Sequence, residues 1–149
     1  MKASDLFVKC LEEEGVTRIF GVPGEENADF MISLKQSKKI EFILCRHEQA
    51  AAFMADAYGR LTGKAGVCLS TLGPGVTNLM TGLADANMDR SPVVAIIGQG
   101  STNRLHKESH QIMDSISMVN PISKWAQTML SPKNITEVVR KACKGAETE

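Results

Sequence analysis

The segment AGVCLSTLGPGVTN, residues 65–78, joins a short apolar run to a glycine-rich turn and then to the start of a helical pattern. Residues 65–70 have the length and apolar character of a buried strand, and Pro74 suits the first turn of a helix. The glycines of the turn let a ligand approach the backbone, and the free amides at the helix start could hold an anion. The turn is neither a G-x-G-x-x-G motif nor a P-loop, so ligand binding and simple helix–sheet packing are both open.

Strand–turn–helix units of this kind recur along the chain. Helices are expected at residues 3–14, about 27–34, 47–61 (with Gly63 placed to end the helix) and from the glycine turn to about 87. Strands are expected at residues 16–20, 41–45, 65–70 and 93–97, and the last of these, VVAII, is a continuous apolar run typical of a strand covered on both faces. This order predicts a three-layer α/β/α fold with a mostly parallel, doubly wound sheet.

The remainder of the chain is less regular. Residues 101–113 are polar and predict a loop, a short helix is expected near residues 112–118, and residues 121–129 are expected to form a further strand. Residues 132–144 predict an amphipathic helix with Ser131 as its N-cap and Pro132 at its first position. A strand would be due after that helix, so we expect residues 1–149 to be one domain and a fragment of a longer enzyme.

Composition excludes several classes of protein. Hydrophobic residues make up 43% and charged residues 23%, as in a folded soluble domain, and 17 basic residues balance 17 acidic ones. With scattered Lys and Arg and no long apolar run, neither nucleic-acid binding nor a membrane span is indicated. The four cysteines form no C-x-x-C pair, so no metal site is indicated, and reduced thiols in the cytoplasm are the expected state.

Glu48 raises a functional question. Ligands of open parallel sheets bind beyond the carboxyl ends of the strands, and Glu48 directly follows the strand at residues 41–45. It is either a first-turn acid favoured by the helix dipole, or a working acid that shares a proton with a ligand nitrogen where water is scarce. The helix that it opens is apolar nearly all round, so we expect a second subunit or domain to cover its outer face.

Three segments together carry a resemblance to a known family: GVPGEEN (residues 21–27), RHEQAAAFMADAYGRLTGKAGVCLSTLGPGVTNLMTGLADA (46–86) and PVVAIIGQ (92–99). They resemble the N-terminal pyrimidine-binding domain of thiamine-diphosphate enzymes, and within that family they look most like acetolactate synthase (acetohydroxyacid synthase). Such enzymes decarboxylate a 2-oxo acid and transfer its acyl group to a second one, a step of branched-chain amino acid biosynthesis.

The resemblance also implies roles for individual residues. The glutamate matching Glu48 bonds the N1′ nitrogen of the cofactor's aminopyrimidine, and Gln111 matches a glutamine that approaches the cofactor-bound intermediate, which makes both catalytic candidates. The positions that match the family's cofactor-binding turns are Pro23, Gly24, Glu48, Thr71, Pro74 and Asn78. The chain departs from the synthase pattern at Val22, Glu25 and His110, so the resemblance is more specific for the cofactor than for the substrate.

The same resemblance implies partners outside this sequence. The family holds Mg²⁺ and the diphosphate through a Gly-Asp-Gly…Asn motif of a separate domain, and no Gly-Asp-Gly occurs here. We therefore expect half a site, a homo-oligomer, no catalysis by this chain alone, and a flavin (FAD) domain only in the full enzyme. Alternatives are the same domain of a pyruvate oxidase or of an acyl-CoA or sulfonate lyase, or a non-catalytic flavodoxin-like module.

Overall fold

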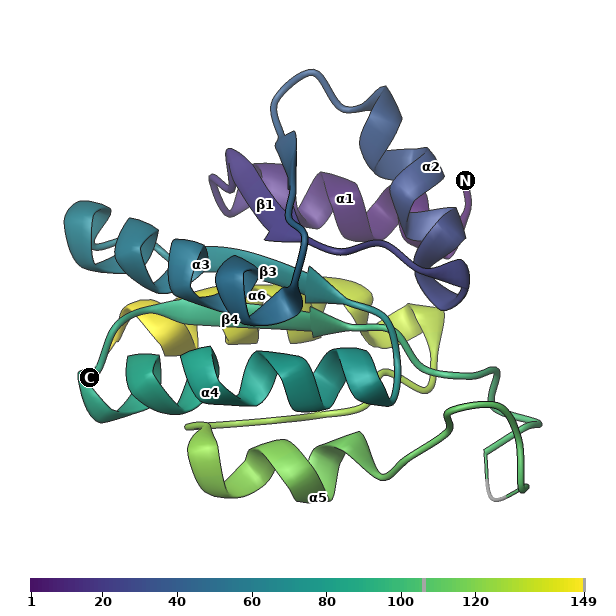
Figure 1. The fold of residues 1–149 in the computed structure, drawn as a ribbon. Coiled ribbons are helices and arrows are strands. Elements are labelled where there is room, and N and C mark those ends of the chain that lie inside the picture. Colours follow the sequence, from purple (N-terminus) through teal and green to yellow (C-terminus); the bar gives the residue numbers. More distant parts are fainter. Residues whose placement is uncertain (106, 149) are drawn as a thin grey trace.

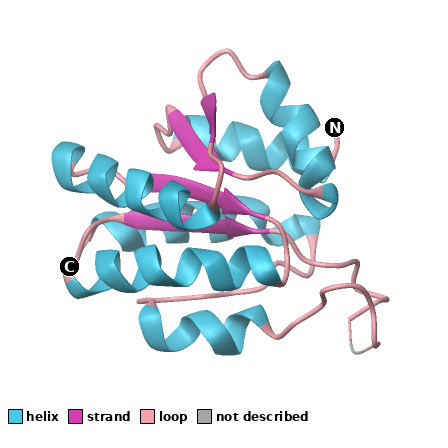
Figure 2. Cartoon of the chain, viewed as in Figure 1, coloured by secondary structure: helices cyan, strands magenta, loops and turns pink. Residues whose placement is uncertain are grey.

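The structure, a computed structural model, describes residues 1–105 and 107–148, so that His106 in the predicted loop and Glu149 lie outside the description. Figure 1 and Figure 2 show strands in the middle and helices on both sides of them. The strands are β1 (Arg18–Gly21), β2 (Glu41–Leu44), β3 (Gly66–Ser70) and β4 (Val93–Ile97). The α-helices are α1 (Ala3–Glu13), α2 (Ala28–Gln36), α3 (Glu48–Thr62), α4 (Pro74–Met88), α5 (Ser115–Val119) and α6 (Ile135–Glu147), and the 3-10 turns are η1 (Glu25–Asn27), η2 (Asn120–Ile122) and η3 (Pro132–Asn134).

The sheet is parallel throughout, in the order β2-β1-β3-β4, which confirms the fold predicted from the recurring units. Phe20 of β1 lies opposite Ile43 of β2 on one side and Cys68 of β3 on the other. Since the strands run the same way, their carboxyl ends meet at one edge of the sheet. β3 is fully buried. β4 lies at the side of the described sheet and only its Val94 is buried, but its side chains pack alternately into cores on the two faces, which confirms that VVAII is covered on both.

Side chains of β3 alternate between two apolar cores, which makes the domain three-layered. Val67 and Leu69 belong to the core formed with α1, α2 and α6, while Cys68 belongs to the core formed with α3 and α4. The first core is the larger, and its buried members from helices are Val8, Leu11, Phe30, Leu34, Ile135, Val139 and Cys143. The second core is built from small side chains: Ala51, Ala52 and Ala55 of α3 pack with Leu79 of α4.

The helices follow the predicted boundaries closely. His47 is the N-cap of α3, where its Nδ1 accepts a hydrogen bond from the Gln49 amide at 3.1 Å, and Gly63 ends the helix with φ of 67°. Ser131 accepts a hydrogen bond from the Lys133 amide, as predicted for a cap, although the first turn there is 3-10 and α6 begins only at Ile135. Within the described part of the chain, no helix has both the length and the apolar character that crossing a bilayer requires.

The strand predicted at residues 121–129 is wrong. Its first residues belong to η2, and the remainder has no regular structure. Lys124 explains the difference, because its Nζ donates to the Gly145 carbonyl at 2.9 Å and to the Thr148 carbonyl, and the Nζ of Lys141 lies 4.6 Å from the centre of the Trp125 ring. These contacts fasten the segment to α6 instead of β4, and a groove of about 1580 Å³ is left beside β4.

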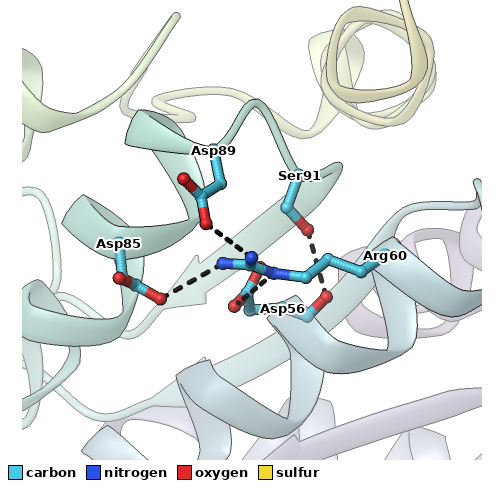
Figure 3. A network of polar contacts seen from close by, with 5 residues as sticks. All are labelled: Asp56, Arg60, Asp85, Asp89 and Ser91. Carbon is cyan, nitrogen blue, oxygen red and sulfur yellow. Dashed lines mark hydrogen bonds and ion pairs between the residues drawn. The ribbon is translucent and has the colours of Figure 1, made fainter.

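Helices α3 and α4 pack closely against each other and are joined by ion pairs. A Cβ atom at Gly82 of α4 would lie 2.5 Å from the Cβ of Ala52 in α3, so the two backbones meet where both side chains are small. Figure 3 shows the far end of the pair, where the Arg60 guanidinium lies among three carboxylates. Its Nε is 2.9 Å and 3.0 Å from the two carboxylate oxygens of Asp56, and its terminal nitrogens reach Asp85 of α4 and Asp89, the residue that caps the end of α4.

Candidate functional site

The candidate site lies where the carboxyl ends of the parallel strands meet. Four turns leave the sheet at this edge, each directly after a strand: residues 22–24, 45–47, 71–73 and 98–100. They bring together residues that are far apart in the sequence, which is the arrangement that open parallel sheets use for ligands. The structure therefore contains the sheet edge, at the carboxyl ends of the strands, where the sequence predicted a site.

Glu48 is the first residue of α3 and is buried, with 8% of its surface exposed. His47, with extended backbone and its side chain as the N-cap, joins the turn after β2 to the helix. Its Oε2 accepts a hydrogen bond of 3.0 Å from the Nδ2 of Asn78 in α4. The structure thus joins two residues that the sequence singled out separately.

The glycine-rich turn supplies the next wall of the site. Gly73 has φ of 58°, which favours glycine, and Pro74 stands exposed at the first position of α4. A Cβ at Gly75 would lie 3.5 Å from Oε1 of Glu48 and 3.3 Å from Cγ2 of Thr71. Gly75 therefore lies between Thr71 and the second carboxylate oxygen of Glu48, with no side chain of its own to separate them.

The turn after β1 packs against Thr71, which precedes the glycine-rich turn. A Cβ at Gly24 would lie 2.6 Å from Cβ of Thr71, so only a glycine lets the two turns touch here. The Gly24 amide donates to Oδ1 of Asn27 at 2.9 Å. The Nδ2 of Asn27 is buried and has no hydrogen-bond partner within the described structure, which leaves an unused donor next to this turn.

The backbone of Gln111 contacts the glycine-rich turn at Gly73. It has φ of 54°, and its carbonyl oxygen would lie 2.5 Å from a Cβ at Gly73. Its side chain is exposed, as is Pro23 in the turn after β1. Of the candidate residues, four therefore form one contiguous group (Gly24, Glu48, Thr71 and Asn78), whereas Gln111, Pro23 and Pro74 border that group at the surface.

Two features of the site were not predicted from the sequence. Gly75 separates Glu48 from Thr71, and the signal for it was present, since it is the second glycine of the turn. The ion pair between Glu26 and Arg104, at 3.5 Å, had no signal, because the two residues lie in different loops far apart in the sequence. No group of three or more His, Cys, Asp or Glu side chains is placed to hold a metal ion in the residues described.

Chemically, the site presents the carboxyl group of Glu48. Its Oε2 is hydrogen-bonded to Asn78, and its Oε1 has no hydrogen bond among the described residues. Asn78 fixes the orientation of Glu48, and burial leaves only 8% of the glutamate exposed to water. A carboxyl held in this way can accept a hydrogen bond from a ligand N–H or exchange a proton with a ring nitrogen at close range. The surrounding glycines leave room for a flat ligand against the backbone.

Comparison with known proteins decides which family this is. Residues 1–118 match the family described as "Thiamine pyrophosphate enzyme, N-terminal TPP binding domain". The chain belongs to this family. Thiamine pyrophosphate is the same compound as thiamine diphosphate, so the match confirms the resemblance seen in the three sequence segments.

Relatives of this TPP-binding domain are acetolactate synthases. It is 46% identical to an acetolactate synthase of Bacillus subtilis over 95% of this chain and 25% of that protein. It is 44% identical to a probable acetolactate synthase large subunit of Methanocaldococcus jannaschii, over 99% and 25% of the two chains. It is 45% identical to a catabolic acetolactate synthase of Raoultella terrigena, over 97% and 26%. The domain thus spans about a quarter of the length of these relatives.

The residues present fit the aminopyrimidine end of thiamine diphosphate. Oε1 of Glu48 has no hydrogen bond among the described residues and offers an acceptor for a protonated ring nitrogen, and Gly75 brings only backbone close to it. Gly24 and Thr71, in contact beside it, complete a cradle that a larger residue would fill. The fit concerns this end of the cofactor, because the described residues show no comparable arrangement for a metal-bound diphosphate.

Proposed function

We propose that this TPP-binding domain is the cofactor-activating part of an acetolactate synthase-type carboligase, which decarboxylates one 2-oxo acid and joins its acyl group to a second. The observation that carries the proposal is the buried carboxylate of Glu48, held by Asn78 on one oxygen and open on the other. The three acetolactate synthases that share 44–46% of their aligned residues with the domain support the choice of reaction.

Glu48 holds and moves the proton at the N1′ nitrogen of the aminopyrimidine. Thiamine diphosphate, when bound, supplies the carbon nucleophile that adds to the carbonyl of the 2-oxo acid. Asn78 keeps the glutamate in one rotamer, so that little reorganisation is needed for proton transfer. The apolar residues around α3 keep water from competing for the same carboxyl oxygen.

The complete enzyme needs parts that lie outside these residues. In our proposal a second domain holds Mg²⁺ and the diphosphate, and where a flavin (FAD) domain exists it also lies elsewhere. The outer face of α3 supports a neighbouring subunit, because Phe53, Met54 and Leu61 are 38%, 44% and 87% exposed there. The four free cysteines suit a cytoplasmic enzyme, and burial raises the pKa of Cys68 to about 12, which keeps that thiol protonated.

Glu48→Gln in the complete enzyme tests the proposal. The substitution keeps the shape and the hydrogen bond to Asn78 but removes the transferable proton. We expect exchange of the cofactor's C2 proton, followed by NMR after acid quench, to slow by at least about a hundredfold, the lower range for loss of an acid–base group. Bound cofactor and folded enzyme should both persist.

Glu137→Gln is the matched control, since Glu137 is exposed on α6, which packs in the other core from α3 and α4. It should leave C2 exchange at the parent rate. Parent-like exchange in Glu48→Gln with cofactor bound would refute the role of Glu48 and, with it, the proposed function.

A further inference from the structure

Arg104 connects the two loops that border the candidate site. Its Nη1 lies 3.5 Å from Oε1 of Glu26 in η1, the turn that follows Gly24. Its Nε and Nη2 both donate to Oγ of Ser109, at 3.2 Å and 2.8 Å. One side chain therefore bridges the turn after β1 and the loop after β4.

Ser109 stands two positions before Gln111, and the intervening backbone is short and constrained. The Ile112 amide donates to the Ser109 carbonyl at 3.2 Å, which closes a tight turn with Gln111 inside it. Gln111 itself has φ of 54°, a conformation that is unfavourable for a residue with a side chain unless its surroundings hold it. The contact of its carbonyl with Gly73 is one such restraint, and Arg104 supplies the other through Ser109.

Glu26 is well placed to orient Arg104. Its side chain is only 20% exposed, and its Cβ lies 3.6 Å from a Cβ position at Gly98, so η1 is packed against the start of the loop. Arg104 is 42% exposed, and its two bonds to Ser109 leave Nη1 free for the carboxylate of Glu26. An exposed ion pair of this kind adds little to overall stability, so its value lies in fixing the geometry of the loop.

We propose that Arg104, oriented by Glu26, is a positioning residue that holds Gln111 against the glycine-rich turn for the handling of the 2-oxo acids. This inference rests on the proposed function, because it assigns Arg104 a part in the same reaction. Arg104 acts on the loop and makes no contact with Glu48 or Asn78, so activation of the cofactor does not depend on it. Loss of the pair affects substrate steps and leaves the proton transfer at Glu48 intact.

The test uses Arg104→Gln, Glu26→Gln and the charge exchange Glu26→Arg with Arg104→Glu, each in the complete enzyme. The carboxylate introduced by Arg104→Glu can accept from the Ser109 hydroxyl, so the exchanged pair can rebuild the bridge. For either single variant we expect kcat/KM for the 2-oxo acid to fall about tenfold, because a misplaced group is costly, with C2-proton exchange within about twofold of the parent. The exchanged pair should recover most of the loss.

Hydrogen exchange of residues 107–113 in the cofactor-free enzyme gives a readout that needs no activity. Protection there should fall about tenfold in each single variant and return in the exchanged pair. Arg18→Gln is the matched control, because the Arg18–Glu41 pair has the same 3.5 Å separation but lies at the opposite end of β1. It should change neither kcat/KM nor loop protection.

Two results would overturn the proposal. One is unchanged loop protection in both single variants, which would show that the bridge does not hold the loop. The other is an equal loss of C2 exchange and of kcat/KM, which would mean that the pair supports the whole site. A failure of the Glu48→Gln test would instead refute the proposed function, and the hydrogen-exchange result would stand independently of it.

Discussion

Replacing Arg60 by glutamine should destabilise the domain substantially. The Asp56 side chain is only 6% exposed and receives two hydrogen bonds from Arg60. Removing one partner of a buried ion pair costs about 3–5 kcal/mol. Because Arg60 is 40% exposed, water can replace part of what is lost, and we expect a decrease of about 2–3 kcal/mol in the free energy of unfolding.

The two half-exposed carboxylates that also pair with Arg60 add little to this expected loss of stability. Asp85 and Asp89 are 50% and 54% exposed, so each pair with Arg60 contributes less than about 1 kcal/mol. For a domain of this size the total corresponds to a fall in Tm of roughly 5–10 °C. Urea unfolding at pH 7, followed by circular dichroism, measures the difference directly. Arg140→Gln, at an exposed position of α6, is the control and should change stability by less than about 0.5 kcal/mol.

Acid pH should remove the difference between Arg60→Gln and the parent. Burial of Asp56 opposes its ionisation, but the hydrogen bonds and positive charge of Arg60 prevail and hold its pKa below the ordinary value. A carboxyl whose pKa is lowered by folding stabilises the folded state above its unfolded pKa of about 3.9. That stabilisation disappears as the pH falls through the lower, folded-state pKa.

The variant and the parent should therefore converge in stability as the pH falls from the unfolded pKa of Asp56 through its lower, folded-state pKa. A loss under about 0.5 kcal/mol at pH 7 would show that Asp56 is satisfied without Arg60. A loss that is the same at pH 7 and at acid pH would show that Arg60 acts through packing of its stem, not through its charge.

Two further substitutions test packing and substrate handling. Gly82→Ala should lower the free energy of unfolding by about 1–3 kcal/mol, since its Cβ would meet Ala52, whereas Gly145→Ala, with nothing within 4 Å, should be neutral or stabilising in thermal unfolding. No loss for Gly82→Ala would mean that α3 and α4 can separate freely. Gln111→Ala in the complete enzyme should reduce carboligation more than C2-proton exchange, and equal losses would contradict a role in the later steps.

The sequence predicted the parts of the fold that local pattern determines. The apolar run at residues 65–70 and the helix opening near His47 are local signals, and they appear as β3 and α3. The sequence singled out Glu48 and Asn78 separately, and the hydrogen bond between them is seen only in the structure, where parallel strands bring the starts of α3 and α4 to one edge of the sheet. Their catalytic and cofactor-binding roles stay predictions that the experiments above address.

Features that depend on partners distant in sequence were beyond such reasoning. Asp56 and Arg60 stand only one helical turn apart, but nothing near them in the sequence shows that Arg60 also pairs with Asp85 and Asp89. The segment at residues 121–129 has strand-like residues, yet its Lys124 and Trp125 contact α6. Pattern predicts that a segment can be a strand, whereas the choice of partner depends on tertiary contacts.

The helix pair α3 and α4 explains how packing far from the site can affect it. Each helix has 15 residues and is thus roughly 22 Å long, and the pair is fastened at both ends. Asn78 holds Glu48 at the site, and Arg60 joins the helices at the other end, with the Gly82–Ala52 approach between them. A shift at the middle contact moves Glu48 relative to Asn78, because both side chains start from backbones that touch there. Gly82→Ala should therefore slow proton transfer at Glu48 as well as destabilise the domain, whereas Arg60→Gln, acting about three turns away, should affect stability alone.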